Sequence, residues 1–303
     1  MVRGILIRLF QAFLTMFVLL ILVFFLVRLS GDPSSYLLSP FTTPEQQARF
    51  NHDLGLDQPL PVQFAMYVGT LARGDLGTSY RMDTPVVDLI SQRLPNTLEL
   101  AGAAMLLILL VGVPLGIYSA YRRGGRLDAF ARFLAAMGQS MPRFWVGLIV
   151  ILVFAVYLHW LPAGGSGKLQ NLVLPAAVMA FGAVGGLIRI LRSSMLEVLD
   201  SDYIRFHRLN GIPERTILWK YALRNAGVAS ITYIGIILAT LISGAVLVET
   251  VFVWPGVGRL MVESVEYRDF NTVQGVLLIF AVIWVTVNLV VDVLYVMLNP
   301  RLR

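Results

Sequence analysis

Polar side chains inside apolar stretches are the strongest candidates for chemistry in this 303-residue chain. Arg143 follows Pro142 inside the apolar stretch 133–160, where we expect a broken or kinked helix that opens backbone carbonyls to it. Asn288 and Asp292 lie four residues apart, on one helical face, in the stretch 273–298. An ionised group in lipid costs at least ~2.5 kcal/mol unless it is paired or faces a water-filled cavity. We therefore predict that Arg143, Asn288 and Asp292 line a translocation pathway or form polar contacts between helices. For Asp292, near the end of its stretch, a static pair near the cytoplasmic surface is the alternative.

Hydrolytic chemistry has little support in the sequence. The run Gly-Gly-Ser-Gly at 164–167 matches a string found in intramembrane serine proteases, but that reaction needs a histidine base close to the serine. Two of the three histidines, His52 and His207, lie in other segments, and His159 is only seven residues upstream in the same short loop. The glycine–lysine pair at 167–168 lacks the Ser or Thr that follows it in a phosphate-binding loop. We predict a glycine–serine turn, no catalytic residue and no ATPase in this chain.

The composition indicates a membrane protein. Apolar residues make up 57% of the chain, charged residues 14%, and the mean hydropathy is +0.75. The first apolar stretch has 19 residues, which as a helix would be roughly 28 Å long and would cross the hydrocarbon of a bilayer. No small-x-small cleavage site follows it, so we expect this helix to be retained. The fold class predicted is an all-α membrane protein with six transmembrane helices, at 9–27, 98–121, 133–160, 172–191, 228–248 and 273–298.

The distribution of basic residues predicts the orientation. The net charge is +6, and fifteen Lys and Arg residues lie at the termini and in the loops on one side, against three in the short loops on the other. Because basic residues concentrate in cytoplasmic loops, we expect both termini in the cytoplasm and the segment 29–95 outside. The arginines flank apolar stretches rather than clustering on a polar module, so nucleic acid is not an expected partner. Cysteine is absent, which excludes a thiolate metal site.

The exterior segment 29–95 is expected to form a small helical cap. Its first helix begins at Thr43, with Gln46 placed to close a capping box. A second helix covers 62–72, and a third runs from Thr84 to a residue before Pro95. Asn96 would then cap the second spanning helix, with Glu99 at its positive end.

The cytoplasmic segment 201–225 is too polar to span and is patterned as two helices. The first, at 203–209, is capped by a residue of the run 200–202 and ended by Asn210 and Gly211; the second runs from Pro213 to residue 225. Such a pair forms a rigid knob, and its interleaved aromatic and basic residues favour a protein socket, although a helix resting on lipid head groups is the alternative. The residues that we expect to couple this chain to a partner are Tyr203, Ile204, Arg205, Phe206, His207, Arg208, Leu209, Asn210 and Gly211.

A second segment of interest lies before the last apolar stretch. Its Trp-Pro-Gly sequence predicts a rigid, non-helical turn on the outer face, and an aromatic side chain there can plug a lumen and swing away. The residues that we assign to an outer gate are Glu249, Trp254, Pro255 and Gly256.

These features together resemble the integral membrane subunits of dipeptide, oligopeptide, nickel and glutathione ABC importers, nearly from end to end. In that family the cytoplasmic knob is the EAA loop, which docks on an ATPase, and positions 202–211 occupy its place. Further matching segments, in the right order, lie at 54–60, 74–77, 93–97, 221–226, 254–260, 268–269 and 288–292. The chain departs from the usual pattern at Phe206, His207, Leu209 and Asn210, at Pro213 where serine is usual, and at Tyr221 where histidine is usual.

The resemblance implies a type-1 ABC permease fold with a small extracytoplasmic cap between helices 1 and 2. Its parts would be 1–28, a cytoplasmic N-terminus with the first helix; 29–95, the cap; 96–298, the permease domain; and 299–303, a cytoplasmic tail. The implied partners are a homologous second permease, two ABC ATPases, an extracytoplasmic solute-binding protein and the lipid bilayer. The chain itself would hold no cofactor and no metal, with ATP and Mg on the ATPases.

The implied location is the cytoplasmic membrane of a bacterium or archaeon. The expected solute is a di- or oligopeptide, and nickel chelates, glutathione and glycosides are alternatives within the same group. An ion-coupled secondary transporter is the alternative from another class; it would need internal inverted repeats, and we detect none in the sequence.

Overall fold

The computed structural model describes the backbone of residues 2–29, 43, 45–46, 49, 52 and 57–298, and the side chains of 10–11, 13–25, the same five isolated residues and 57–291. Two compact units are present. The first contains Met1–Pro95 and Gly256–Val285, and the second contains Asn96–Pro255 and Thr286–Arg303.

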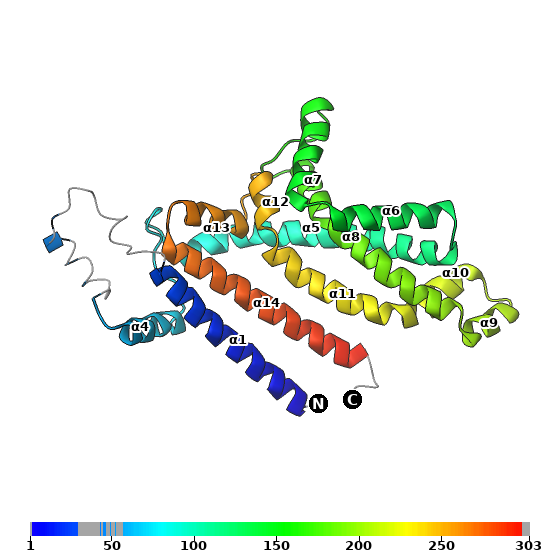
Figure 1. Cartoon of the computed structure of the whole chain (residues 1–303), viewed down its shortest axis with the longest axis horizontal. Helices are drawn as coiled ribbons and strands as arrows, with labels where there is room; N and C mark the ends of the chain where they lie inside the picture. Colours follow the sequence, from blue (N-terminus) through cyan, green and yellow to red (C-terminus); the bar gives the residue numbers. More distant parts are fainter. Residues whose placement is uncertain are drawn as a thin grey trace. The chain divides into compact units, whose positions relative to one another are not determined.

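The regular elements of the described residues are helices, and the only extended pairing among them is an isolated bridge between Thr78 and Pro85 (Figure 1). Helices long and apolar enough to cross a membrane are α5 (Val86–Tyr121), α8 (Leu169–Leu199), the continuous run Glu214–Ser243, and α14 (Phe270–Leu298) as far as Val291. A bent pair adds a fifth candidate. The first helix, α1 (Val2–Leu29), contains an apolar run at Phe13–Phe25. The all-α membrane class is confirmed, and six spans stays a prediction.

The expected break between the cap and the second span is absent. Helix α5 runs through Pro95 without interruption, so the third cap helix and the second span are one helix, and the predicted boundary at 95/96 falls inside it. A proline removes only one N–H from the helix, and buried side chains on both sides, including Ile90 and Leu100, keep each half packed. Asn96 therefore lies inside the helix rather than capping it, and the cap assigned to Asn96 and Glu99 is wrong.

The predicted single span at 133–160 is two helices. Helix α6 (Arg126–Ser140) ends before Pro142. Helix α7 (Arg143–Val150) follows and continues into the π-helical segment η1 (Ile151–Tyr157). The run Arg143–Tyr157 is bent by 109° relative to α6. The residue before Pro142 is extended, with φ −94° and ψ 131°, as steric contact with a proline ring requires. The break beside Arg143 is confirmed, but its angle was not expected.

The second cytoplasmic helix does not end at residue 225. A short helical turn, α10 (Glu214–Thr216), a π-helical segment, η2 (Ile217–Ala222), and α11 (Leu223–Ser243) follow one another without a break. The apolar stripe of the knob therefore continues into the spanning helix. At its other end, α11 has Ser243 as its last helical residue, five residues before the predicted end of this span at residue 248. A separate short helix, α12 (Val246–Val251), follows.

In the first unit, α1 packs against the second cap helix, α4 (Leu60–Ala72). The ring of Phe24 lies 5.3 Å from that of Phe64 and 5.8 Å from that of Tyr67, measured between centroids. The capping box at the start of the first cap helix is confirmed, since the amide of Thr43 donates to Gln46 Oε1 and the amide of Gln46 donates to Thr43 Oγ1. Most of the remaining cap before residue 57 lies outside the described residues.

The exterior loop that follows α4 is tied to the start of α14 within the same unit. Asp269, 3% exposed, accepts hydrogen bonds from Ser79 Oγ (2.5 Å) and Thr272 Oγ1 (2.7 Å). Asn271 Nδ2 donates to the carbonyl of Thr78 at 2.9 Å. A further helix, α13 (Val257–Glu266), carries Glu263, which pairs with Arg93 and Arg259. These contacts give the exterior loop a fixed shape.

In the second unit, α8 packs against α6 and α11 through glycines. A Cβ at Gly185 would lie 2.7 Å from the carbonyl oxygen of Ala135, and one at Gly138 would lie 2.6 Å from that of Phe181, so the backbones of α6 and α8 touch. Near one end of this contact, Arg192 Nε donates to Asp128 Oδ1 at 2.7 Å, and Asp128 is 1% exposed. The buried carboxylate and its arginine fix the register of the two helices.

The orientation predicted from the basic residues is open to a direct test because the chain has no native cysteine. We expect Arg73→Cys, at the exposed end of α4, to react with an impermeant maleimide from outside intact cells, and Arg123→Cys, in the exposed turn before α6, to react only from inside. Both variants should react after detergent permeabilisation, which serves as the control. Labelling in the opposite pattern would contradict the orientation.

Candidate functional site

The cytoplasmic knob contains a short helix followed by a glycine turn. Helix α9 covers Asp202–Leu209, Ser201 precedes it in an extended conformation, and Asn210 follows it. Gly211 has φ +70°, a left-handed conformation that costs a residue with a Cβ about 1 kcal/mol or more. The predicted helix at 203–209 and the predicted glycine break are therefore confirmed as structure.

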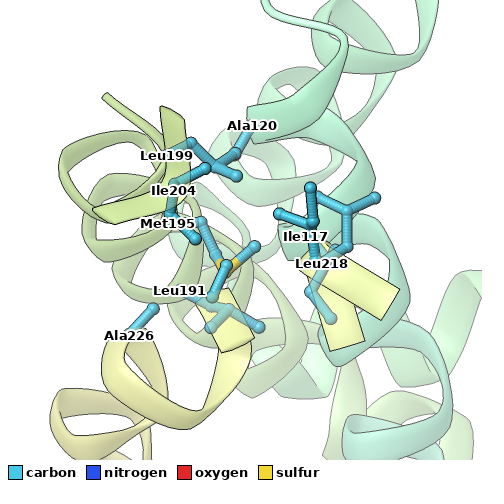
Figure 2. Packing of buried hydrophobic residues seen from close by; sticks show 10 residues of the cluster. Ile117, Ala120, Leu191, Met195, Leu199, Ile204, Leu218 and Ala226 are labelled. Atoms are coloured by element: carbon cyan, nitrogen blue, oxygen red, sulfur yellow. The ribbon is translucent and has the colours of Figure 1, made fainter. Parts of the chain in front are cut away.

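One residue of α9 joins the hydrophobic core beneath it. Ile204 is fully buried in a cluster that we call the cytoplasmic core, drawn from α5, α8, α9, η2 and α11 (Figure 2). Fully burying such a side chain stabilises the fold by roughly 1.5–3 kcal/mol. The core residues are Ile117, Ala120, Leu191, Met195, Leu199, Ile204, Ile217, Leu218, Ala222 and Ala226. Helix α9 is thus fixed to one end of α5 and α8 and to the start of α11.

Aromatic and polar contacts hold the same helix along its side. The ring of His207 stacks on that of Tyr221 with centroids 4.2 Å apart, and Asn225 Nδ2 donates to the Tyr203 hydroxyl at 2.8 Å. Arg208 Nε donates to Glu214 Oε1 at 2.8 Å and so bridges the glycine turn. These contacts fix the angle between α9 and the start of the next helix.

The exposed side of α9 carries two large apolar side chains among charged ones. Phe206 is 63% exposed and Leu209 is 88% exposed. Large apolar side chains gathered on a fixed, otherwise polar helix are typical of a surface that a partner covers. Of the nine predicted coupling residues, Ile204 is buried, and Phe206 and Leu209 are the large apolar side chains most exposed for contact.

The segment assigned to an outer gate is buried in the second unit. Trp254 is 1% exposed, and its Nε1 donates to the carbonyl of Asn96 at 2.9 Å, while Asn96 Nδ2 donates to the carbonyl of Pro255 at 2.9 Å. Glu249 is fully buried and accepts a hydrogen bond from Thr97 Oγ1 at 2.7 Å. Trp254 is therefore an anchor against α5 in this structure. Its role in a gate stays a prediction.

Backbone strain lies directly beside this anchor. Val253 has φ +53°, a conformation that is unfavourable for a β-branched residue and costs roughly 1–3 kcal/mol. The preceding carbonyl, of Phe252, accepts a hydrogen bond from the amide of Gly165 at 3.1 Å and occupies the space where a Cβ of Gly164 would lie. The predicted glycine–serine turn is thus packed against the Trp254 segment. The sequence offered no signal for the strain at Val253.

The role predicted for Arg143, Asn288 and Asp292 stays a prediction. Arg143 is half-buried at the start of α7, and its guanidinium points to the break after α11, 3.3 Å from where a Cβ of Gly244 would lie. Asn288 is half-buried on α14. The side chain of Asp292 lies outside the described residues. Among the residues that are described, no group of three or more His, Cys, Asp or Glu side chains could hold a metal.

The architecture defines a class: among the described residues, an all-helical membrane protein with several candidate spans, a loop after α4 that is tied to α14, and a short helix, α9, that exposes large apolar side chains. The family model "Binding-protein-dependent transport system inner membrane component" matches residues 112–303, and the model for the N-terminal part of the same membrane component matches residues 1–101. The chain belongs to this family of inner-membrane transport components.

Individual relatives support this membership. The chain is 42% identical to the probable D,D-dipeptide transport system permease protein DdpB of Escherichia coli, over 90% of this chain and 88% of that protein. It is 39% identical to the oligopeptide transport system permease protein AppB of Bacillus subtilis, over 90% of each. It is 37% identical to the glutathione transport system permease protein GsiC of Salmonella paratyphi A, over 100% of this chain and 99% of that protein.

A solved structure has the same fold. A chain from the MetNI methionine ABC transporter matches 70% of this chain and 97% of its own length, with a TM-score of 0.58 and 18% identity. At this identity the match bears on the fold alone, and it confirms the predicted type-1 permease architecture.

The anchoring role of Trp254 predicts a graded loss of stability. Trp254→Ala removes a large buried side chain and should cost roughly 3–5 kcal/mol, whereas Trp254→Phe keeps most of the apolar contact and loses one hydrogen bond, about 1 kcal/mol. Thermal unfolding of the purified, detergent-solubilised protein should therefore rank the wild type above Trp254→Phe and both well above Trp254→Ala. Equal midpoints for the wild type and Trp254→Ala would contradict the burial.

Proposed function

We propose that this chain is the permease subunit of an ATP-driven, binding-protein-dependent peptide importer and forms its translocation pathway with a second, homologous permease. The observation that carries the proposal is α9: a short helix with exposed Phe206 and Leu209, fixed to the spanning helices through Ile204. Such a helix can pass on the motion of a bound partner because it has little freedom of its own.

The partners follow from the family and from the names of the relatives. A component of a binding-protein-dependent system needs an extracytoplasmic solute-binding protein, and an ABC importer needs two ATPases, which would carry ATP and Mg. With both termini in the cytoplasm, as the basic residues predict, α9 would lie on the ATPase side. We assign no ATP hydrolysis to this chain.

The solute class is a di- or oligopeptide. Relatives 39% and 42% identical over nine-tenths of the chain are named for oligopeptide and D,D-dipeptide transport. Glutathione is a second candidate, because a relative named for its transport is 37% identical over the whole chain. Glutathione is itself a modified tripeptide, so both candidates are small peptides with free carboxylates.

The mechanism that we infer is alternating access. Closure of the ATPases on ATP binding would move α9, the cytoplasmic core would pass this motion to α8 and α11, and the spanning helices would open outward to accept solute from the binding protein. The segment from Glu249 to Gly256 would then open as the outer gate. The strain at Val253 would favour such a rearrangement, because a second conformation could relieve it.

Reconstitution tests the function as a whole. The chain is purified with the proteins that accompany it in its native membrane, placed in proteoliposomes with its binding protein, and supplied with tri-alanine. We expect tri-alanine uptake that requires ATP and the two ATPases. Uptake driven by a proton or sodium gradient without ATPases would contradict the proposal in favour of a secondary transporter.

Variants of α9 test the coupling role. Phe206→Ala should weaken ATPase binding, since a buried aromatic anchor at an interface is typically worth at least ~2 kcal/mol. Gly211→Val should leave the contact residues in place but change the angle of α9, so the ATPases should still co-purify while uptake per ATP hydrolysed falls.

The matched control is Phe133→Ala, because Phe133 is 61% exposed on α6, away from α9. Co-purification yield, ATP hydrolysis and tri-alanine uptake are measured for each complex. Normal uptake by both α9 variants would refute the coupling role.

A further inference from the structure

Helix α4 belongs to the segment that we expect outside the membrane, yet it carries no charged side chain. The charge-free run extends over residues 58–72, with Asp57 before it and Arg73 and Asp75 after it. Apolar helices of this length occur in protein cores or as re-entrant and interfacial segments of membrane proteins. The 13 residues of α4 form a helix roughly 20 Å long, which is too short to cross ~30 Å of hydrocarbon.

The burial pattern of α4 is the reverse of that of a helix in water. Its one buried side chain is polar: Gln63 is 8% exposed, and its Nε2 donates to the carbonyl of Gln58 at 2.7 Å. Large apolar side chains lie on the surface instead, with Leu60 47%, Val62 43% and Met66 51% exposed. The helix is therefore not a core helix of this chain. A helix that is apolar on all sides needs an apolar environment around it.

Aromatic contacts place α4 beside the first apolar helix. Phe64 lies against both Phe17 and Phe24 of α1, with ring centroids 6.4 and 5.3 Å apart, and Tyr67 lies 5.8 Å from Phe24. In the predicted first span, 9–27, Phe17 is near the middle, and Phe24 is three residues, roughly 5 Å, from the outer end. A helix that contacts both side chains lies at the depth of the outer half of this span.

The surface of α1 beside this contact is apolar as well. Phe13 is 68% exposed, Phe17 41% and Leu22 51%, and no charged residue interrupts the sequence from 9 to 27. Such a surface is expected of a span that faces lipid, and the exposed side chains of α4 continue it onto the neighbouring helix. The docking surface of a soluble binding protein would be expected to be about as polar as the rest of a protein surface.

We propose that α4 is an interfacial helix, which lies in the lipid leaflet at the outer end of α1 and contacts acyl chains through Leu60, Val62 and Met66. Helices of this kind bury their apolar side ~5–10 Å into the boundary between head groups and acyl chains, in agreement with the ring contacts to α1. The inward Gln63 and the charged residues at both ends of the helix fit this position. The inference depends on the predicted first span and goes beyond the proposed function.

Spin labels measure the position of α4 directly, because the chain has no native cysteine. Met66→Cys and, separately, Val62→Cys are labelled in an assembled complex whose other subunits carry no reactive cysteine, in phosphatidylcholine nanodiscs. Power saturation then measures how readily each label meets O₂, which concentrates in hydrocarbon, and the water-soluble complex NiEDDA. Both labels should meet O₂ readily and NiEDDA several-fold less often than a label at Arg73→Cys, at the exposed end of the same helix. Leu110→Cys, 62% exposed on α5, is the reference within a candidate span.

Hydroxyl-radical footprinting tests the same helix without a substitution. Radicals formed in water oxidise methionine to the sulfoxide, and mass spectrometry measures the rate at each methionine. Met66 should be oxidised several-fold more slowly than Met82, in the exterior loop, although Met66 is 51% exposed in this chain and Met82 only 36%. Unfolding the complex should remove the difference, which is the control.

Three results would overturn the proposal. If the labels at Met66→Cys and Val62→Cys meet NiEDDA as often as the label at Arg73→Cys, α4 lies in water. If they meet neither reagent, a second permease or the binding protein covers the helix instead of lipid. Oxidation of Met66 at least as fast as that of Met82 would contradict the proposal independently of any substitution.

Discussion

The close approach of α8 to its neighbours is the contact on which the second unit depends. At Gly138 and Gly185 the backbones of α6 and α8 touch, and at Gly186 the hydroxyl of Tyr233 takes the place of a side chain. In lipid, where water cannot drive helices together, such backbone approach gives dispersion contacts that larger residues would prevent. A Cβ at any of these glycines would separate the helices that carry the cytoplasmic core.

The same packing connects the cytoplasmic surface to the spanning region. Leu191, Met195 and Leu199 continue α8 beyond the glycines and surround Ile204 of α9. Because η2 and α11 are continuous, the core also holds the spanning helix that carries Tyr233. A partner that moves α9 therefore acts on a packed body rather than on a loop. Close-packed protein interiors have low compressibility, so they transmit a displacement from one side to the other.

Local sequence signals predicted local structure well. The helix at 203–209, the left-handed Gly211, the capping box at Thr43 and the break at Pro142 depend on residues within a few positions of one another, and the structure has all four. The predicted helix ends before Pro95 and at residue 225 were wrong, because both helices continue through these positions. Tertiary packing of the residues on both sides outweighs the low helix propensity at the predicted end. The burial of Trp254 depends on a contact with Asn96, which lies far away in the sequence, and the spacing of residues along the chain does not encode it.

The central claim is that α9 moves with the spanning helices as one body. The cysteine-free chain allows spin labels at Asp202→Cys on α9 and Arg123→Cys in the turn after α5, both exposed and outside the proposed ATPase contact, in a complex whose other subunits carry no reactive cysteine. Double electron–electron resonance then measures the distance between the labels with and without bound ATP. The account predicts one narrow distance distribution that ATP leaves unchanged, and a broadened distribution when Ile204→Ala removes the core contact. A wild-type distance that shifts when ATP binds would contradict the account, because α9 would then be moving independently of the helices it is meant to drive.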